Sequence, residues 1–426
     1  MNSSDNLKSK LTGGEYNEIL SKLYGEKNLT AQIERYVQAV DEFVNIFGVT
    51  EGLELFSAPG RTEIGGNHTD HNFGKVLAGS VNLDIIAVAA KNDSGIIRVK
   101  SKGFNMDVIE LSDMSVHDNE TTHSASLIRG VAAKYQMEGY QIGGFDAYTT
   151  SDVLKGSGIS SSAAFEVLIC TILSELYNNG AVDPVDQAKF SQFAENVYFG
   201  KPCGLMDQMA SAVGGIISID FKDTSAPIIN KVDFDFTKTG YSLCIVDTGG
   251  NHADLTGEYS AIPAEMKSVA QALGGTVLRD ITKEQVLENA AKLREALGDR
   301  AVLRALHYFD ENERADMEVA ALSEGDFAKF LDTVIRSGDS SFKYLQNVYA
   351  NINPSEQGIS LALCLAEEIL KGKGAWRVHG GGFAGTTQNF VPPELIDAFR
   401  SRMESVFGEG HCHTLFIRPV GGIRVS

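Results

Sequence analysis

The chain has little positive charge, a single tryptophan and no long apolar run. Its 426 residues include 37 Lys and Arg against 56 Asp and Glu, which gives a formal net charge of −19. A protein that binds nucleic acid or an acidic membrane surface needs a basic face, so this balance argues against both partners. The opening ten residues are polar, and no segment is apolar enough to predict a signal peptide or a membrane-spanning helix. We therefore expect a cytoplasmic protein.

Cysteines are also few, and they are scattered along the chain. Five cysteines with no regular spacing are typical of free thiols in a reducing compartment. The hydrophobic content of 43% and the charged content of 22% are ordinary for a soluble globular protein. A chain of this length can form two or three domains, and nothing in it points to an obligate protein partner.

Two common nucleotide-binding motifs are missing. The glycines at 156–158 are followed by no Gly-Lys-Ser/Thr, which excludes a Walker A loop, and they lack the Gly-x-Gly-x-x-Gly spacing of a dinucleotide fold. The segment at 153–164 instead reads Val-Leu-Lys-Gly-Ser-Gly-Ile-Ser-Ser-Ser-Ala-Ala. Its glycines allow backbone to approach a ligand closely. Three serines then precede a helix expected from Ala163, and a loop that leads into a helix N-terminus favours phosphate binding.

The hydrophobic pattern predicts an α+β protein with strands early in the chain and helices late. Helical spacing covers 15–48, with Gly48 as the expected end. Strands are predicted at 81–90, 96–99, 144–150, 215–220, 241–247, 375–378, 385–391 and 411–418. Further helices are predicted at 124–136, 163–177, 185–198, 206–213, 262–273, 283–296, 300–322, 326–336, 341–350, 357–369 and 393–407. We place the change of domain near residues 215–245, before the mostly helical part of the chain, and divide the chain into 1–215 and 216–426.

Two other segments combine polar side chains with turn-forming residues. Residues 57–72 crowd glycines, Asn, His and Asp into one turn-rich stretch. Its donors and acceptors suit a polyhydroxyl ligand, although a solvated loop has the same composition. In 201–208, Asp207 follows a Pro/Gly turn and opens a helix. Asp207 is therefore either a helix N-cap or a carboxylate directed at a substrate hydroxyl.

Two more features allow a structural and a functional interpretation. Glu195 lies in a predicted helix, where it is either a solvated side chain or, if it faces phosphates, a ligand for Mg²⁺. Residues 379–385 form a second glycine-rich loop, His-Gly-Gly-Gly-Phe-Ala-Gly. This loop is either a flexible hairpin or backbone held close to a ligand or to the first glycine loop.

Taken together, these segments resemble the GHMP kinase family, and within it the galactokinases. Residues 60–71 are similar to the galactokinase signature Gly-Arg-Val-Asn-Leu-Ile-Gly-Glu-His-Thr-Asp-Tyr. Residues 202–208 nearly match Pro-Cys-Gly-Ile-Met-Asp-Gln, and 153–164 are similar to the loop Pro-x-Gly-x-Gly-(Leu)-Ser-Ser-Ser-Ala. The resemblance covers most of the chain. It implies a two-domain GHMP kinase fold with mixed sheets and helices and an active site in the cleft between the domains.

The resemblance also implies an activity and a role for each matching residue. The activity is transfer of phosphate from ATP to D-galactose, giving α-D-galactose 1-phosphate and ADP, in the Leloir pathway of galactose catabolism. Asp207 would be the catalytic carboxylate, and Arg61 would stabilise charge beside it. The implied sugar-binding residues are Asn67, His68, Asp70, Gly204 and Tyr259. The implied ATP-binding residues are Gly156, Ser157, Gly158, Ile159, Ser160, Ser161 and Ser162. Ser162 and Glu195 would hold Mg²⁺.

The chain departs from the family pattern at several positions. Asn67 stands where the signature has Glu, a residue that contacts the 6-hydroxyl side of the sugar, and Thr62–Gly65 replace Val-Asn-Leu-Ile. Leu154 replaces the proline of the phosphate loop, Ala384 replaces a glycine of the third motif, and the tryptophan before the helix at 124 is missing. Asn67 keeps L-arabinose, galacturonate and an N-acetylhexosamine open as substrates. A non-catalytic sugar and ATP sensor is a further alternative, which the presence of Asp207, Arg61 and the serine run disfavours.

Overall fold

The computed structural model describes residues 3–153, 159–201, 203–250, 255–383 and 385–426. The α-helices are α1 Ser4–Thr12, α2 Asn17–Tyr24, α3 Leu29–Phe47, α4 Ser124–Met137, α5 Ser161–Asn178, α6 Pro184–Phe193, α7 Met206–Val213, α8 Thr256–Ala272, α9 Lys283–Glu288, α10 Ala290–Leu297, α11 Asp299–Glu324, α12 Phe327–Ser340, α13 Gly358–Leu370 and α14 Ile396–Phe407. The strands are β1 Glu54–Gly65, β2 Lys75–Lys91, β3 Ile96–Ser101, β4 Met106–Glu110, β5 Phe145–Ser151, β6 Ile216–Asp220, β7 Ile228–Val232, β8 Ser242–Asp247, β9 Ala375–His379, β10 Thr386–Val391, β11 Cys412–Leu415 and β12 Ile423–Arg424.

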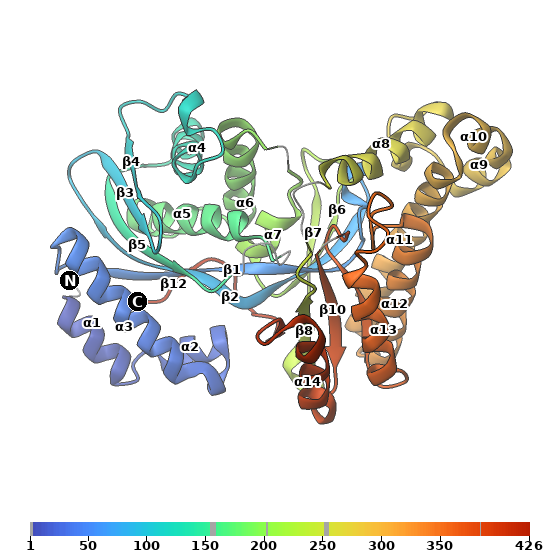
Figure 1. The fold of residues 1–426 in the computed structure, drawn as a ribbon. Coiled ribbons are helices and arrows are strands. Elements are labelled where there is room, and N and C mark those ends of the chain that lie inside the picture. Colours follow the sequence, from blue (N-terminus) through green and yellow to red (C-terminus); the bar gives the residue numbers. More distant parts are fainter. Residues whose placement is uncertain (1–2, 154–158, 202, 251–254, 384) are drawn as a thin grey trace.

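The larger of the two sheets is built around the long strands β1 and β2. Its strand order is β12-β1-β2-β5-β3-β4, and β6 extends it by pairing with β2 and β7. Only the β3–β5 pair is parallel among the described strand pairs. In Figure 1, β1 and β2 cross the middle of the molecule, with α4, α5, α6 and α7 on one side and α1, α2 and α3 on the other.

Both faces of the central strands β1 and β2 are buried, which explains the nearly continuous apolar run of β2. Successive side chains of a strand point to opposite faces. Leu55 and Ile86 pack with the apolar residues of the N-terminal helices, whereas their neighbours Phe56 and Ala87 pack into the core beneath α4 to α7. A strand covered on both faces reads as a continuous hydrophobic segment rather than an alternating one.

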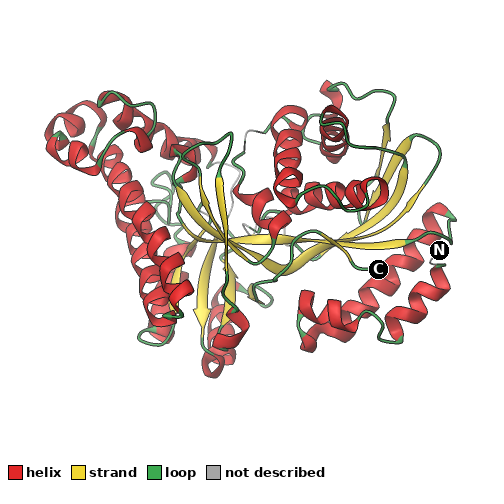
Figure 2. Cartoon of the chain, turned by 180° about the vertical axis from the view of Figure 1, so that it is seen from behind, coloured by secondary structure: helices red, strands yellow, loops and turns green. Residues whose placement is uncertain are grey.

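The smaller sheet has the order β11-β8-β10-β9 and is antiparallel throughout. Helices α11 to α14 belong to the same half of the molecule, as the view from behind in Figure 2 also shows. The end of the chain then returns to the larger sheet, where β12 pairs with β1 and Ser426 Oγ accepts a 2.8 Å hydrogen bond from the Leu55 amide. The two marked ends of the chain lie on the same side in both views.

The mixture of helices and sheets agrees with the predicted α+β class, but the N-terminal helix is interrupted. Helix α3 ends at Phe47, which agrees with the end predicted at Gly48, and Gly48 adopts the left-handed conformation with φ 69°. The helical spacing over 15–48 is broken at Gly25, whose φ of 74° no helix allows. Helix α1 was not predicted, because its residues are mostly polar. The predicted helix at 341–350 is reduced to a π-helical turn at Ser341–Leu345.

The turn-rich stretch at 57–72 is half strand, which corrects the prediction of a loop. Strand β1 continues to Gly65, and its pairing with β2 is irregular between Pro59 and Arg61 and again between Glu63 and Gly65. Irregularities of this kind let a strand contain proline and glycine and redirect its side chains, and they are common beside active sites. The sheet therefore fixes the side chains of this segment more firmly than a loop would.

The division of the chain at residue 215 remains a prediction. Strands β6 and β7 lie beyond that residue, yet they belong to the larger sheet with β1 and β2.

None of the helices in the described part of the chain combines the length and apolar character that crossing a bilayer requires.

Candidate active site

Three predicted residues meet at the start of helix α7. Arg61 Nε donates a hydrogen bond of 2.6 Å to Asp207 Oδ1, and Ser160 Oγ donates one of 2.5 Å to Asp207 Oδ2. Asp207 is the second residue of α7, and Leu205 is the N-cap, so the N-cap interpretation of Asp207 is wrong. The side chain of Asp207 is 29% exposed. It is therefore fixed by its neighbours and still accessible to a ligand.

The electrostatic surroundings keep Asp207 ionised. Burial alone would raise the pKa of this carboxyl, but the charge of Arg61 and the hydrogen bonds from Arg61 and Ser160 outweigh it and hold the pKa below its ordinary value. The position in the first turn of a helix favours the anion further. Asp207 is thus a carboxylate at physiological pH and a weak base.

The end of the predicted phosphate loop lies directly against strand β1. The amide of Arg61 donates a hydrogen bond of 3.0 Å to the Ile159 carbonyl. A Cβ at Gly60 would lie 2.8 Å from that same carbonyl oxygen, so a larger residue there would push the two segments apart. Helix α5 begins at Ser161, two residues earlier than predicted, and its free N–H groups face the loop. The predicted ATP-binding residues Gly156, Ser157 and Gly158 lie outside the described residues.

The two predicted magnesium ligands also lie side by side. Ser162 Oγ donates a hydrogen bond of 3.2 Å to Glu195 Oε1, and Lys201 Nζ lies 3.4 Å from the same oxygen. Gln208 Nε2 donates bonds to Glu195 Oε2 at 2.7 Å and to Glu166 Oε2 at 3.2 Å. Burial and the adjacent Glu195 raise the pKa of Glu166 well above its ordinary value.

The donor set of Ser162 and Glu195 fits a magnesium ion. Mg²⁺ prefers oxygen ligands and is commonly bound through one or two protein oxygens together with substrate phosphates. A hydroxyl and a carboxylate next to a helix N-terminus supply this combination. Glu195 is only 2% exposed, so a cation beside it would also compensate a buried negative charge.

A cavity of about 220 Å³ opens beside Asp207. Its lining contains three carboxylates, one guanidinium and two imidazoles, which makes it strongly polar. The lining residues are Arg61, Glu63, His68, Asp70, His71, Cys203, Gly204, Met206, Asp207, Gly380 and Gly381. Of the five predicted sugar-binding residues, the structure brings His68, Asp70 and Gly204 to this cavity.

Each of these three residues is positioned by a specific contact. His68 Nε2 lies 3.2 Å from the Gly381 carbonyl oxygen, which ties the first motif to the third. Burial lowers the pKa of His68 to about 4, so its ring is neutral at physiological pH. A Cβ at Gly204 would lie 2.9 Å from Asp70 Oδ2. Glycine at 204 therefore lets the carboxylate of Asp70 reach the cavity beside Asp207.

Asn67 is not brought to the cavity. It is fully buried, and its Nδ2 donates to Glu63 Oε1 at 2.8 Å and to the Gly380 carbonyl at 2.7 Å. Its Oδ1 accepts from Asn347 Nδ2 at 2.9 Å and from Ser341 Oγ at 3.2 Å. Both ends of the side-chain amide are therefore used by the protein itself.

Tyr259 supports the third motif from outside the cavity. It lies in α8, its hydroxyl donates a hydrogen bond of 2.9 Å to the Gly382 carbonyl, and its ring packs edge-on against Phe383. The third motif is thus held between Tyr259 on one side and His68 on the other. Ala384, the departure from the family pattern in this motif, lies outside the described residues.

Several lining residues were not predicted, and one of them carries a charge. Glu63, His71, Cys203, Met206, Gly380 and Gly381 line the cavity in addition to the predicted residues. For Glu63 a signal existed, because residues two apart in a strand share a face. Because the sequence predicts a loop over these residues, it does not predict that Arg61 and Glu63 lie on one face of β1.

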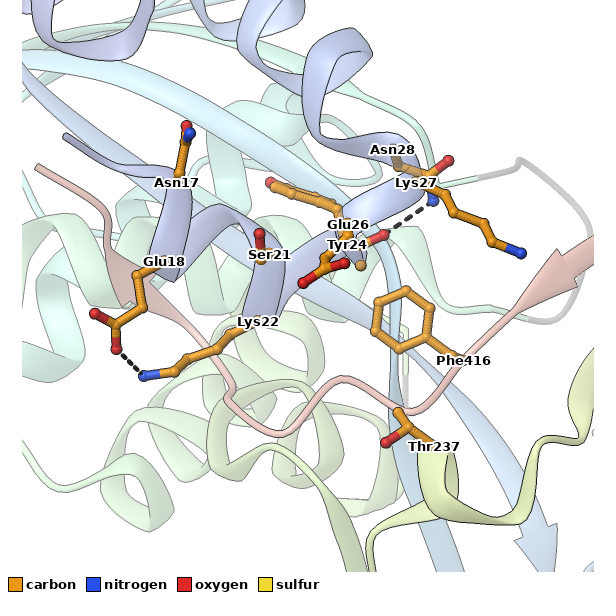
Figure 3. Close-up of a pocket in the computed structure, with 11 residues that line it drawn as sticks. Asn17, Glu18, Ser21, Lys22, Tyr24, Glu26, Lys27, Asn28, Thr237 and Phe416 are labelled. Atoms are coloured by element: carbon orange, nitrogen blue, oxygen red, sulfur yellow. Dashed lines mark hydrogen bonds and ion pairs between the residues drawn. The ribbon is translucent and has the colours of Figure 1, made fainter. Parts of the chain in front are cut away.

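A larger cavity lies elsewhere and lacks comparable chemistry. It measures about 860 Å³ and lies between α2, the turn that follows it, Thr237 and Phe416, as Figure 3 shows. Lys22 in this cavity is paired with Glu18 at 2.9 Å on the helix surface. An exposed ion pair of this kind contributes little to stability. Cavity size alone therefore does not select a candidate site, whereas the perturbed groups around Asp207 favour the smaller cavity as the candidate.

Comparison with known proteins connects this geometry to a family. The galactokinase galactose-binding signature matches residues 41–91, and the N-terminal domain of the GHMP kinases matches residues 126–215. A galactokinase of Streptomyces coelicolor is 32% identical over 372 residues, which cover 86% of this chain and 92% of that protein. A galactokinase of Actinobacillus pleuropneumoniae is 32% identical over 374 residues, covering 85% of this chain and 91% of that protein.

Solved structures show the same fold. The galactokinase of Lactococcus lactis, in complex with galactose, superposes with a TM-score of 0.76 at 23% identity and covers 90% of this chain and 98% of its own. The mevalonate kinase of Methanococcus jannaschii superposes with a TM-score of 0.60 at 11% identity, covering 85% of this chain and 98% of its own. The predicted GHMP kinase fold is thereby confirmed.

Proposed function

The chain belongs to the galactokinase family of the GHMP kinases, and on this basis we propose that it transfers the γ-phosphoryl group of ATP to the anomeric hydroxyl of D-galactose. The products would be α-D-galactose 1-phosphate and ADP. The observation that carries the proposal is the contact of Asp207 with both Arg61 and Ser160. This contact joins the end of the phosphate loop to a polar cavity of sugar size.

Asp207 is the residue that meets the reacting hydroxyl. Its carboxylate accepts a hydrogen bond from the 1-hydroxyl and orients the oxygen toward the γ-phosphorus. It takes the proton as the new O–P bond forms and the bond from the γ-phosphorus to the β–γ bridging oxygen breaks, which releases ADP. The proton then passes to solvent. A carboxylate with a lowered pKa is a weak base, which suits phosphoryl transfer, because in a loose transition state positioning and electrostatics matter more than early proton removal.

Arg61 and the loop serines act on the phosphates. The guanidinium of Arg61 keeps Asp207 ionised and lies where charge develops on the transferring group. The phosphates would bind at the segment that the sequence assigns to ATP, residues 156–162, with the N–H groups at the start of α5 as donors. Ser162 and Glu195 would hold Mg²⁺, which when bound neutralises phosphate charge. His68, Asp70 and Gly204 bind the sugar, and Tyr259 positions the third motif beside it.

The charges of the cavity favour a neutral sugar. Glu63, Asp70 and Asp207 bring three carboxylates to it, whereas Arg61 brings one guanidinium. An anionic substrate such as galacturonate would add a negative charge to a site that already has an excess of them. Carboxylates are strong acceptors for hydroxyl donors, and a hexose offers several of these.

The experiment is ADP release from MgATP across a panel of free sugars. The panel contains galactose, 2-deoxygalactose, galactosamine, N-acetylgalactosamine, L-arabinose, galacturonate and glucose. We expect turnover on galactose and little on arabinose or galacturonate. Turnover on another sugar instead would keep the mechanism and change the substrate. If the protein binds ATP and sugar without turnover, the non-catalytic sensor becomes the supported function and the kinase proposal is wrong.

A further inference from the structure

The charged residue that the structure adds to the cavity lies on the same strand face as Arg61. Arg61 pairs with Ser80 and Glu63 pairs with Ala78, in an uninterrupted part of the β1–β2 ladder. Side chains two residues apart in such a ladder point to the same side of the sheet. Arg61 and Glu63 both line the cavity, whereas Asn67 lies four residues further on and is buried away from it.

Two donors hold Glu63 by one of its oxygens. Glu63 Oε1 accepts from Asn67 Nδ2 at 2.8 Å and from Arg377 Nη2 at 3.2 Å. Arg377 is fully buried, and its other nitrogens donate to the carbonyls of Val378 and Ile64. Within the described part of the chain, Glu63 Oε2 accepts no hydrogen bond. The carboxylate is therefore fixed in orientation while one oxygen remains for a ligand.

The residue types also match the family signature in reversed order. In Gly-Arg-Val-Asn-Leu-Ile-Gly-Glu-His-Thr-Asp-Tyr, Asn stands at the position of Glu63 and Glu stands at the position of Asn67. The two side chains contact each other directly in this chain. One carboxylate and one carboxamide are thus retained as a pair, and only their order along the chain is exchanged.

We propose that Glu63 is a specificity-determining residue that accepts a hydrogen bond from a sugar hydroxyl, and that Asn67 and Arg377 position it. This inference rests on the proposed function, because it takes the cavity to be a sugar site. It relocates to Glu63 the sugar contact that the sequence assigned to position 67. The carboxyl group that Asn67 lacks is supplied from β1 by Glu63.

The test is the Glu63→Gln variant, with ligand binding measured by calorimetry in the absence of ATP. Gln keeps a carbonyl oxygen for Asn67 and Arg377 but presents an N–H₂ donor where Glu63 presents an acceptor. The probes are D-galactose and its 2-, 3-, 4- and 6-deoxy analogues. We expect E63Q to bind galactose at least tenfold more weakly than the wild type. For the one analogue that lacks the contacted hydroxyl, the two proteins should agree within twofold.

A matched control and a second variant keep this test decisive. Glu54→Gln changes the same residue type at the other end of β1, where Glu54 pairs with Arg424 on the surface, and should leave galactose binding unchanged. If E63Q does not fold, Glu63→Asp retains the charge but shortens the reach by one methylene. E63D should weaken galactose binding at least threefold, with the difference vanishing for the same analogue.

The outcomes separate this inference from the proposed function. Equal galactose affinity of E63Q and the wild type, or an equal loss for every analogue, overturns the role of Glu63 even where the wild type phosphorylates galactose. A loss of affinity in E63Q that vanishes for one deoxy analogue supports the role of Glu63. This holds even where the wild type releases no ADP and the proposed kinase activity is wrong. Absence of galactose binding by the wild type overturns both.

Discussion

Asp207 and Asp84 are both held by arginines, and of these two aspartates only Asp207 is available to a ligand. Asp207 accepts one hydrogen bond on each oxygen and remains 29% exposed. Asp84, in β2, is fully buried. Its Oδ1 accepts from Arg35 at 2.7 Å, and its Oδ2 accepts from Tyr24 at 2.5 Å and from Arg418 at 3.2 Å. Ser57 donates to the same Oδ2.

The comparison shows that a paired carboxylate is not by itself a catalytic one. At both sites burial would raise the pKa, and arginine charge and hydrogen bonds outweigh it and lower the pKa. Both oxygens of Asp84 accept hydrogen bonds from the protein itself, with donors in the N-terminal helices, in β1 and in the tail of the chain. These bonds connect distant parts of the fold. Asp207 keeps part of its capacity for a substrate. Substitutions at the two sites should therefore separate activity from stability.

The largest expected effect on activity comes from Asp207→Asn. The amide keeps the size of the side chain and removes its charge and basicity, so kcat with MgATP and galactose should fall by about 10²- to 10⁴-fold. The melting temperature and the Kd for ATP should change little, because Asp207 is partly exposed. A D207N enzyme with wild-type kcat would remove Asp207 from the mechanism.

The largest expected effect on stability comes from Asp84→Asn. Removing this charge leaves Arg418 buried without an acidic partner and leaves Arg35 with only the partly exposed Asp152, which should cost about 3–5 kcal/mol in the free energy of unfolding. Urea unfolding measures this loss, and kcat per folded molecule should stay within twofold of the wild type. A normal unfolding free energy would show that the network around Asp84 is not structural.

The wild type and the D84N protein should lose stability in acid to different extents. Because the folded-state pKa of Asp84 is lowered, its contribution to stability is present above the unfolded pKa of about 3.9 and is lost as pH falls through the folded value. The unfolding free energy of the wild type should decline below about pH 4. The D84N protein should decline less steeply, and identical slopes would contradict the assignment.

Arg61→Gln should act through Asp207 and move the acidic limb of the activity profile. In the wild type the pKa of Asp207 lies below its ordinary value, so the acidic limb of kcat/KM should lie below the ordinary range of an aspartate, about pH 4. Without the guanidinium, burial is less opposed and the pKa rises, which shifts the limb to higher pH. We expect kcat to fall by about 10²-fold as well. An unshifted limb would indicate that Arg61 does not control Asp207.

The smallest effects should come from single hydroxyls at the two sites. Tyr24→Phe removes one donor from Asp84 and should lower the unfolding free energy by about 1.5 kcal/mol without changing kcat. Ser160→Ala removes one donor from Asp207 and should lower kcat/KM several-fold without changing the unfolding free energy. Both variants are measured by urea unfolding and by ADP release, and a reversed pattern would contradict the comparison.

The sequence predicted which residues lie together at the candidate site better than it predicted how they are arranged. The family motifs named Arg61 and Asp207 correctly as neighbours, because such motifs preserve residue types at fixed positions along the chain. They did not reveal that 57–65 is a strand, since proline and glycines hide the alternation that places Arg61 and Glu63 on one face. The orientation of Asn67 depends on Asn347 and Gly380, which are distant in sequence.

The fold was predicted in class and in most elements, and the errors have physical causes. Strand β2 was recognised only from 81 to 90, because its first residues, Lys75 to Ser80, mix polar and small side chains. Helix α1 escaped notice because only Leu7 and Leu11 mark its apolar face. The return of residues 423–424 to β1 is a long-range pairing that no local pattern encodes.

The most direct measurement of the central claim is galactose-dependent ADP release from MgATP by the wild type and D207N side by side. The account predicts turnover that saturates with galactose for the wild type. It predicts a folded, ATP-binding D207N protein that releases at least a hundredfold less ADP. A wild type that releases no ADP with galactose, or a D207N protein that keeps pace with it, would contradict the account.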